Sequence, residues 1–182
     1  MEKIKLHDKT FRVCISSQKI DEYVTNVANK INNDLKNVDT PIFLGVLNGS
    51  FMFTADLMRK IKIQSDIVFI KLASYEGTSS CGEVKQIMGL TKSVKGRTVV
   101  IVEDIVDTGG TIEELYKILE ADGAADIKVC TLFLKPDSYK KSIKIDYPAI
   151  EIPNDFIVGY GLDYNQLGRQ YKDIYVLDEK VV

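Results

Sequence analysis

The segment that decides the fold is Val99–Thr111, which reads VVIVEDIVDTGGT. The predicted strand Arg97–Val102 is rich in β-branched residues and is the strongest strand signal in the chain. Two adjacent carboxylates, Glu103 and Asp104, end this strand, and a third, Asp107, lies in the short loop that follows. The sequence therefore predicts a buried strand that leads into a cluster of acids directly before a glycine turn.

The turn itself, Thr108–Thr111, has the composition of an anion site at the start of a helix. Gly109 and Gly110 let the backbone approach a ligand closely, and the N–H groups and dipole of the helix attract negative charge. Thr108 and Thr111 add hydroxyl donors. Because the turn contains no lysine and lacks P-loop spacing, a phosphate monoester fits it better than a nucleoside triphosphate.

Glu103 and Asp104 need a partner, because acids beside a phosphate repel it unless something positive intervenes. A divalent cation or a vicinal diol supplies that partner, and Mg²⁺ prefers carboxylate, diol and phosphate oxygens. The ligand predicted here is a sugar phosphate with free hydroxyl groups. The alternative is a purely structural one, in which the strand ends in an acidic turn and Asp107 or Thr108 only caps the next helix.

Strands and helices alternate on both sides of this segment. Several predicted strands are apolar throughout, as expected when helices cover both faces of a parallel sheet. We therefore predict an α/β fold with a parallel twisted sheet flanked by helices, in which ligands bind at the carboxyl ends of the strands. The predicted strands are 42–47, 67–72, 97–102 and 127–134, with shorter pieces at 150, 156–158 and 174–177, and the predicted helices are 20–35, with Ser16 or Ser17 as its cap, 51–61 and 111–122.

Composition narrows the function classes. With 182 residues and 45% apolar content the chain suits one domain, and its formal charge of −2 argues against a broad nucleic-acid surface. No stretch approaches the ~20 apolar residues that cross a bilayer, so we expect no membrane partner. Cys14, Cys81 and Cys130 are too dispersed for a disulfide framework or zinc site, and reduced thiols fit the cytoplasm. We expect Cys14 and Cys130 in the core, Cys81 exposed, and His7 on the surface rather than acting as a base.

The acid cluster and glycine turn resemble the phosphoribosyl-pyrophosphate signature of the type I phosphoribosyltransferases. The shared pattern is a hydrophobic strand, two acids, two apolar residues, Asp-Thr-Gly and then Thr. The chain from about Ile42 to Asp178 resembles the hypoxanthine-guanine branch of that family. This resemblance implies a single domain, residues 1–182, with a small hood built from the C-terminal segment and N-terminal residues.

The resemblance also implies an activity. A member of this branch is a glycosyltransferase of purine salvage, which moves the 5-phosphoribosyl group of phosphoribosyl pyrophosphate to hypoxanthine or guanine. The products are IMP or GMP and pyrophosphate, and Mg²⁺ is the expected cofactor. The family suggests a homodimer or homotetramer.

Roles at the sugar follow from the matching residues of the family. The turn Asp107–Thr111 is expected to hold the ribose 5-phosphate. Glu103 and Asp104 are expected to face the ribose hydroxyls and the metal, and to favour the positive charge that develops on the sugar. Asp107 matches the proposed general base, which faces the imidazole-ring nitrogen of the purine.

The pyrophosphate loop matches Leu47, Asn48 and Gly49, and family members often have a cis peptide where Leu47 joins Asn48. The family commonly has lysine at the position of Asn48, so we expect backbone amides to bind most of the pyrophosphate here. Arg169 is expected to reach the same group. An ordinary Asn-Gly turn is the alternative for this loop.

The purine site matches residues that follow later strands. Lys135 is expected to donate to the 6-oxo group, Phe156 to stack on the ring, and Ile157 to offer backbone groups to its edge. Asp163 is expected to hold a second Mg²⁺. Without the resemblance, Lys135 would be read as a solvated residue at a strand end and Phe156 as a core residue.

A lid is expected to begin at Ser74 and Tyr75, in the Gly/Ser-rich stretch that ends at Gly89. Such a lid would exclude water from the reacting sugar. Composition alone also allows a disordered hairpin.

Two other functions remain open from the sequence. One is a non-catalytic regulator that senses phosphoribosyl pyrophosphate and binds RNA, which should present a basic face. The other is a transferase that prefers a different base, such as xanthine or adenine.

Overall fold

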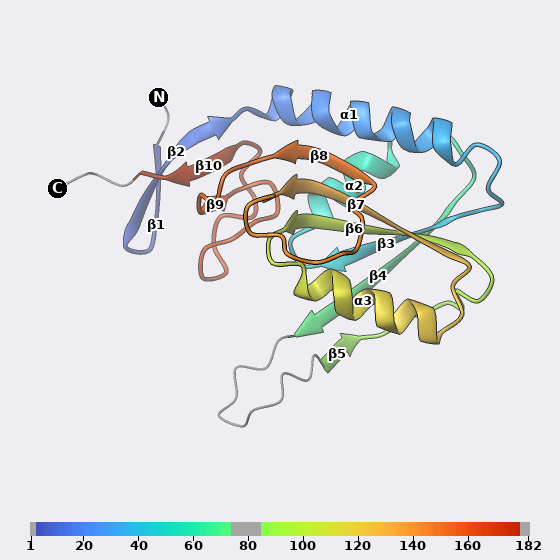
Figure 1. Ribbon diagram of the computed structural model, residues 1–182. Helices are drawn as coiled ribbons and strands as arrows, with labels where there is room; N and C mark the ends of the chain where they lie inside the picture. Colours follow the sequence, from blue (N-terminus) through green and yellow to red (C-terminus); the bar gives the residue numbers. More distant parts are fainter. Residues whose placement is uncertain (1–2, 74–84, 179–182) are drawn as a thin grey trace.

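The computed structural model describes residues 3–73 and 85–178 (Figure 1). Its main sheet has six strands in the order β5-β4-β3-β6-β7-β8. Five of these strands are parallel, as predicted, and β5 alone runs antiparallel to its neighbour β4. The strands are β3 (Ile42–Leu47), β4 (Asp66–Ala73), β5 (Lys85–Met88), β6 (Thr98–Val106), β7 (Asp126–Leu134) and β8 (Tyr147–Glu151).

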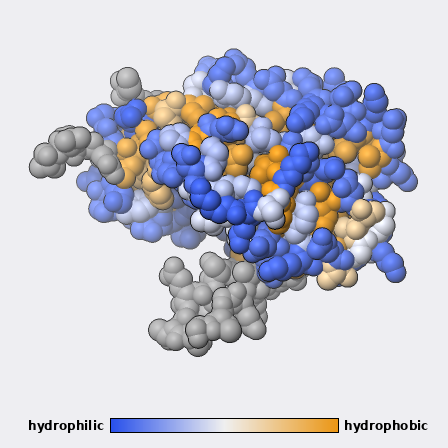
Figure 2. All heavy atoms as spheres, viewed as in Figure 1, coloured by the Kyte–Doolittle hydropathy of each residue, from blue (hydrophilic) through white to orange (hydrophobic). Residues whose placement is uncertain are grey.

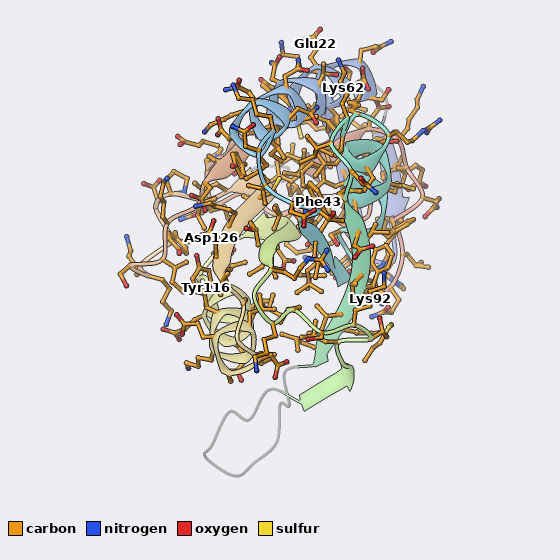
Figure 3. All side chains as sticks on the ribbon, turned by 90° about the vertical axis from the view of Figure 1, so that its right-hand side faces the viewer. Glu22, Phe43, Lys62, Lys92, Tyr116 and Asp126 are labelled. Atoms are coloured by element: carbon orange, nitrogen blue, oxygen red, sulfur yellow. The ribbon has the colours of Figure 1, made fainter. Side chains whose placement is uncertain are left out.

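Within residues 3–73 and 85–178, three helices cover the two faces of this sheet: α1 (Ser17–Asp34), α2 (Phe51–Met58) and α3 (Gly110–Ala121). In Figure 1, α1 and α2 lie on one side and α3 on the other. Neighbouring strand residues divide between these sides, so that Phe43 packs with α1 and α2, whereas Ile42 and Leu44 pack with α3. Figure 3 shows Phe43 in the interior between the helices, where it is fully buried. This two-sided burial explains the continuously apolar strands.

Helix boundaries follow local signals. The side chain of Ser16 caps α1 by accepting a hydrogen bond from the backbone of Lys19, as one of the two predicted caps. The helix α2 ends at Met58, three residues before the predicted end. Gly123, with a φ of +78°, lies just beyond α3, where a left-handed residue stops the helix.

The end of the central strand is a correction. We predicted that the strand stops at Val102, but β6 continues to Val106 and pairs with β7 as far as the register Val106 with Leu134. Glu103 and Asp104 therefore lie inside a strand. Pairing with β7 satisfies the backbone groups of this last stretch, so two carboxylates do not suffice to end it.

A second, antiparallel sheet, here called the small sheet, has the order β1-β2-β10-β9. In Figure 1, β6, β7 and β8 point toward it, so it lies near their carboxyl ends. The N-terminal residues, for which the sequence patterns predicted no strand, form two of its strands and bury Leu6 and Phe11. The strands are β1 (Lys3–Leu6), β2 (Lys9–Ile15), β9 (Ile157–Val158) and β10 (Ile174–Leu177).

The cysteine prediction was half right. Cys130 is fully buried on β7, and this burial raises the pKa of its thiol. Cys14 is exposed, which corrects our expectation, because it alternates with Phe11 and Val13 along β2 and shares its face with Arg12. His7 is exposed, as expected, and Cys81 lies outside the described residues.

The viewed surface is mostly hydrophilic, with hydrophobic residues showing between polar ones (Figure 2). Of the helices in the described ranges, none is long and apolar enough to cross a membrane.

Candidate active site

A cavity of about 530 Å³ lies at the carboxyl ends of β3 and β6. Among the described residues, four parts of the chain line it: the end of β3 with the loop that follows, Leu72 of β4, the end of β6 together with the turn 107–111, and the segment that carries Asp163 and Arg169. The structure thus brings the predicted phosphoribosyl residues and most of the predicted pyrophosphate residues into one space. Their individual roles stay predictions.

The acid pair forms the floor of this cavity. Glu103 and Asp104 are 7% and 8% exposed. Burial raises the pKa of both carboxyl groups, and for Glu103 the neighbouring charge of Asp104 raises it further. Within the described residues, Oε2 of Glu103 is buried and finds no hydrogen-bond partner. Such an oxygen favours a cation or a ligand hydroxyl group at this place.

The loop after β3 lies directly against the acid pair. The peptide between Leu47 and Asn48 is cis, as the resemblance implied. A Cβ added to Gly49 would clash with the carboxylate of Asp104, so only glycine fits here. Leu47 and Gly49 line the cavity, whereas Asn48 is exposed and is not among the lining residues. This arrangement favours binding by the loop backbone over binding by the Asn48 side chain.

The turn 107–111 presents the beginning of α3 to the cavity. Gly109 is the N-cap residue with a φ of +85°, a left-handed conformation, and no side chain of the described residues caps the helix. A Cβ on Gly110 would meet nothing within 4 Å, so the space beside it is open. An uncapped first turn that faces open space can offer its N–H groups to an anion.

Asp107 and Lys135 form an ion pair that the sequence did not reveal. Nζ of Lys135 lies 3.0 Å from Oδ2 of Asp107, and Lys135 is 9% exposed. The two residues follow adjacent parallel strands that pair as far as Val106 and Leu134, and the backbone N–H of Lys135 donates to Val106. The register of β6 and β7 could have predicted the contact.

A second ion pair joins Asp163 and Arg169. Nη2 of Arg169 lies 2.6 Å from Oδ1 of Asp163, and Oδ2 of Asp163 accepts a hydrogen bond from the backbone of Gln166. Nη1 of Arg169 donates to the carbonyl of Gly161 at 2.7 Å. Both oxygens of Asp163 are therefore engaged, and each keeps a further lone pair that could accept another ligand.

The predicted purine residues are more widely separated than the predicted phosphoribosyl residues. Phe156 is 45% exposed and lies against Tyr164 and Phe11, with ring centroids 5.7 Å and 6.2 Å away. Ile157 is buried in β9, where it pairs with Val176. Neither Phe156 nor Ile157 is among the described residues that line the cavity. Phe156 has an open face, which excludes the core alternative.

The chain matches the phosphoribosyl transferase domain family over residues 16–165. It belongs to this family. It is 44% identical over 142 residues to a hypoxanthine-guanine phosphoribosyltransferase of Streptococcus pyogenes serotype M3, covering 78% of this chain and 79% of that protein. It is 40% identical over 162 residues to the hypoxanthine phosphoribosyltransferase of Buchnera aphidicola subsp. Schizaphis graminum, covering 88% and 92%.

Solved structures of similar proteins support the same family assignment. A hypoxanthine-guanine phosphoribosyltransferase of Bacillus anthracis is 34% identical, with a TM-score of 0.85 over 91% of this chain and 97% of that one. A Trypanosoma cruzi hypoxanthine phosphoribosyl transferase is 33% identical, with a TM-score of 0.86 over 96% and 94%. The predicted family and fold class are confirmed, and the chain is a phosphoribosyltransferase-type enzyme.

The acid pair does not by itself complete a site for the expected Mg²⁺, but it can supply two of the ligands. In residues 3–73 and 85–178, no group of three or more His, Cys, Asp or Glu side chains is placed to hold a metal by itself. Glu103 and Asp104 supply a buried pair with one unsatisfied oxygen. Mg²⁺ usually keeps waters and substrate phosphates among its ligands, so two carboxylates together with a substrate fit it.

Tyr160 is a residue that we did not predict for this phosphoribosyltransferase site. It is buried, has a φ of +47°, and its hydroxyl donates to Oδ2 of Asp56 on α2 at 2.6 Å. Burial and this hydrogen bond raise the pKa of the phenol. A Cβ on the next residue, Gly161, would clash with the carbonyl of Gly49. Tyr160 thus joins the segment before Asp163 to α2, and the neighbouring Gly161 lies directly against the loop after β3.

The predicted lid residues Ser74 and Tyr75 lie outside the described residues.

Proposed function

We propose that this protein transfers the 5-phosphoribosyl group of phosphoribosyl pyrophosphate to hypoxanthine and guanine, giving IMP or GMP and pyrophosphate in purine salvage. The observation that carries the proposal is the buried pair Glu103 and Asp104 in one cavity with the uncapped turn 107–111. The turn suits a phosphate, and the acids suit hydroxyl groups and a cation beside it. The relatives named above carry the same activity in their names.

The sugar is held at both ends in this proposal. N–H groups of the turn 107–111 bind the 5-phosphate, and the carboxylates of Glu103 and Asp104 face the ribose hydroxyls. Their fixed negative charge favours the cationic, oxocarbenium-like sugar, an effect worth about 3 kcal/mol for a well-placed group. Bound Mg²⁺, with Glu103 and Asp104 as its protein ligands, would neutralise charge on the leaving pyrophosphate.

The purine reacts above Asp107. One imidazole nitrogen forms the bond to the sugar, pyrophosphate leaves with the electron pair of the broken bond, and the proton of the other imidazole nitrogen passes to Asp107. Lys135 donates to the 6-oxo group, and an adenine amino group would face it as a second donor. The observed ion pair, 3.0 Å long, supports this assignment because it holds both groups together at one edge of the sheet.

Pyrophosphate is bound by the backbone at Leu47, Asn48 and Gly49 and by Arg169. Arg169 lies in the cavity wall and is oriented by Asp163 and the carbonyl of Gly161. Asp163 would serve a second Mg²⁺ through the lone pairs that its contacts with Arg169 and Gln166 leave free.

The remaining features complete the proposal. The chain is one domain, residues 1–182, with the small sheet as its hood. Phe156 stacks on the purine, Ile157 contacts its edge through the backbone, and the segment from Ser74 and Tyr75 closes as a lid. The exposed face of Phe156 supports the stacking role.

We further propose a cytoplasmic homodimer or homotetramer. The free thiols of Cys14 and Cys130 fit a reducing compartment. The exposed ring of Phe51, at 39%, offers an apolar surface for a second copy.

The test is nucleotide formation from hypoxanthine, guanine, xanthine and adenine in parallel, with and without Mg²⁺. We expect IMP and GMP, dependence on Mg²⁺, and little AMP. Tight capture of RNA without any nucleotide product would instead identify the regulator. Nucleotide formation from xanthine alone would show that xanthine, and not hypoxanthine or guanine, is the substrate.

A further inference from the structure

The 5-phosphate site contains an acid that should oppose its ligand. Glu113 lies in the first turn of α3, the helix whose beginning faces the cavity. The turn 107–111 contains no lysine or arginine of its own. A carboxylate at a helix N-terminus competes with a phosphate for the same positive end of the helix dipole. Something from elsewhere in the chain must therefore offset Glu113 if a phosphate dianion binds there.

Lys141 is placed to do this. Its Nζ lies 2.9 Å from Oε2 of Glu113, although the two residues are 28 positions apart in the sequence. The Lys141 ammonium lowers the pKa of the Glu113 carboxyl, so Glu113 is charged at neutral pH and its charge is matched by Lys141.

The stem of Lys141 also touches the turn. A Cβ added to Gly109 would come 2.9 Å from Cγ of Lys141 and 2.5 Å from Cε2 of Tyr139. The Tyr139 hydroxyl donates to the carbonyl of Ile143 at 2.5 Å, which closes this segment on itself. Lys141 is thus held beside the phosphate-binding turn by packing as well as by charge.

We propose that Lys141 is a positioning residue that neutralises Glu113 and thereby allows the 5-phosphate dianion to bind at the start of α3. This inference rests on the proposed function, because it concerns the same phosphate site. The side chains of Lys141 and Glu113 are 35% and 42% exposed. An ion pair this exposed contributes little to folding stability. Its effect should therefore appear in phosphate affinity rather than in the stability of the fold.

The experiment compares Lys141→Gln, Glu113→Gln and the double variant with the unaltered protein. The KM for phosphoribosyl pyrophosphate, kcat, and the affinity for ribose 5-phosphate are measured at low and high salt. Lys144→Gln is the matched control, because Lys144 lies on the same segment and pairs with Asp146 at 3.1 Å, and Asp146 binds the backbone of Val129 near the beginning of β7.

We expect Lys141→Gln to raise KM and weaken ribose 5-phosphate binding roughly three- to tenfold, with kcat changed less than about twofold. The difference should shrink at high salt. Glu113→Gln should bind ribose 5-phosphate at least as tightly as the unaltered protein does. The double variant should bind it with the affinity of the unaltered protein. Lys141→Arg should restore binding, because it keeps the charge.

Two results would overturn the inference. One is a Lys141→Gln variant indistinguishable from Lys144→Gln. The other is a double variant as weak as Lys141→Gln, because Lys141 would then act on the phosphate without Glu113. Failure of the proposed function would look different: the unaltered protein would make no nucleotide, while the ribose 5-phosphate affinities would still report on Lys141.

Discussion

The candidate site has two proposed ends, one for the sugar phosphate (the sugar end) and one for the purine (the purine end), and the chain builds them differently. The sugar end comes mainly from one stretch, Glu103–Thr111, and its parts meet in one cavity. The purine end draws on Lys135 after β7 and on Phe156 and Ile157 next to the small sheet, and these three do not line that cavity. The sugar end is fixed by a single strand and turn, whereas the purine end depends on how the two sheets lie relative to each other.

The first prediction concerns Asp107, which belongs to both ends. Asp107→Asn should lower kcat on the order of a hundredfold or more, because a general base is lost. The KM for phosphoribosyl pyrophosphate should change little, because the backbone of the turn remains. Steady-state kinetics with hypoxanthine measures both, and unchanged turnover would remove Asp107 from the role of base.

The second prediction tests how tightly the sugar end is packed. Gly49→Ala should reduce transfer about a hundredfold, because the new methyl group would push the loop away from Asp104 and misplace the reactants. Gly96→Ala is the control for backbone strain without a clash, since Gly96 has a φ of +72° but a Cβ there meets nothing within 4 Å, whereas Gly49 has no positive φ and its Cβ would meet Asp104. Equal activity losses in the two variants would mean that the contact with Asp104 is unimportant.

The third prediction separates the two ends. Lys135→Ala should weaken use of hypoxanthine roughly thirtyfold, because the 6-oxo group loses its donor. Affinity for phosphoribosyl pyrophosphate should fall much less. The comparison uses kcat/KM for hypoxanthine and for phosphoribosyl pyrophosphate. Equal losses for the two substrates would mean that Lys135 does not act specifically on the purine.

The smallest expected effect concerns the hydrogen bond that joins Tyr160, between the purine-end residues and Asp163, to Asp56 on α2. Tyr160→Phe should lower the free energy of unfolding by about 1 kcal/mol, because it removes the hydrogen bond to Asp56. Tyr164→Phe is the control, because its hydroxyl bonds to Asp8 at an exposed place. Urea titrations of both variants compare them, and a Tyr164→Phe effect as large as that of Tyr160→Phe would contradict the special role of the Asp56 contact.

Local signals predicted that the acids, the glycine turn and the following helix adjoin one another, and they failed where contacts are long-range. The acids, the glycine turn and the following helix are contiguous, so their order in the sequence is their order in space. The strand end at Val102 was wrong because the pairing of β6 with β7 extends to Val106. The Tyr160–Asp56 hydrogen bond joins residues 104 positions apart, and no local pattern marks either partner.

The small sheet also depends on long-range contacts that local sequence patterns do not predict. Leu6 and Phe11 lie among charged residues, and their burial depends on β9 and β10 from the other end of the chain. The ion pair of Asp107 with Lys135 is intermediate between a contiguous motif and an unpredictable long-range contact. The two residues are far apart in the sequence, but strand register alone would have placed them side by side.

The central claim is that Glu103 and Asp104 bind a metal-bearing sugar phosphate. Isothermal titration of phosphoribosyl pyrophosphate into the unaltered protein and into a Glu103→Gln/Asp104→Asn variant, each with and without Mg²⁺, tests it most directly. We predict that Mg²⁺ strengthens binding to the unaltered protein at least tenfold, roughly 1.4 kcal/mol, and has little effect on the variant. Equal Mg²⁺ dependence in the two proteins would contradict the claim.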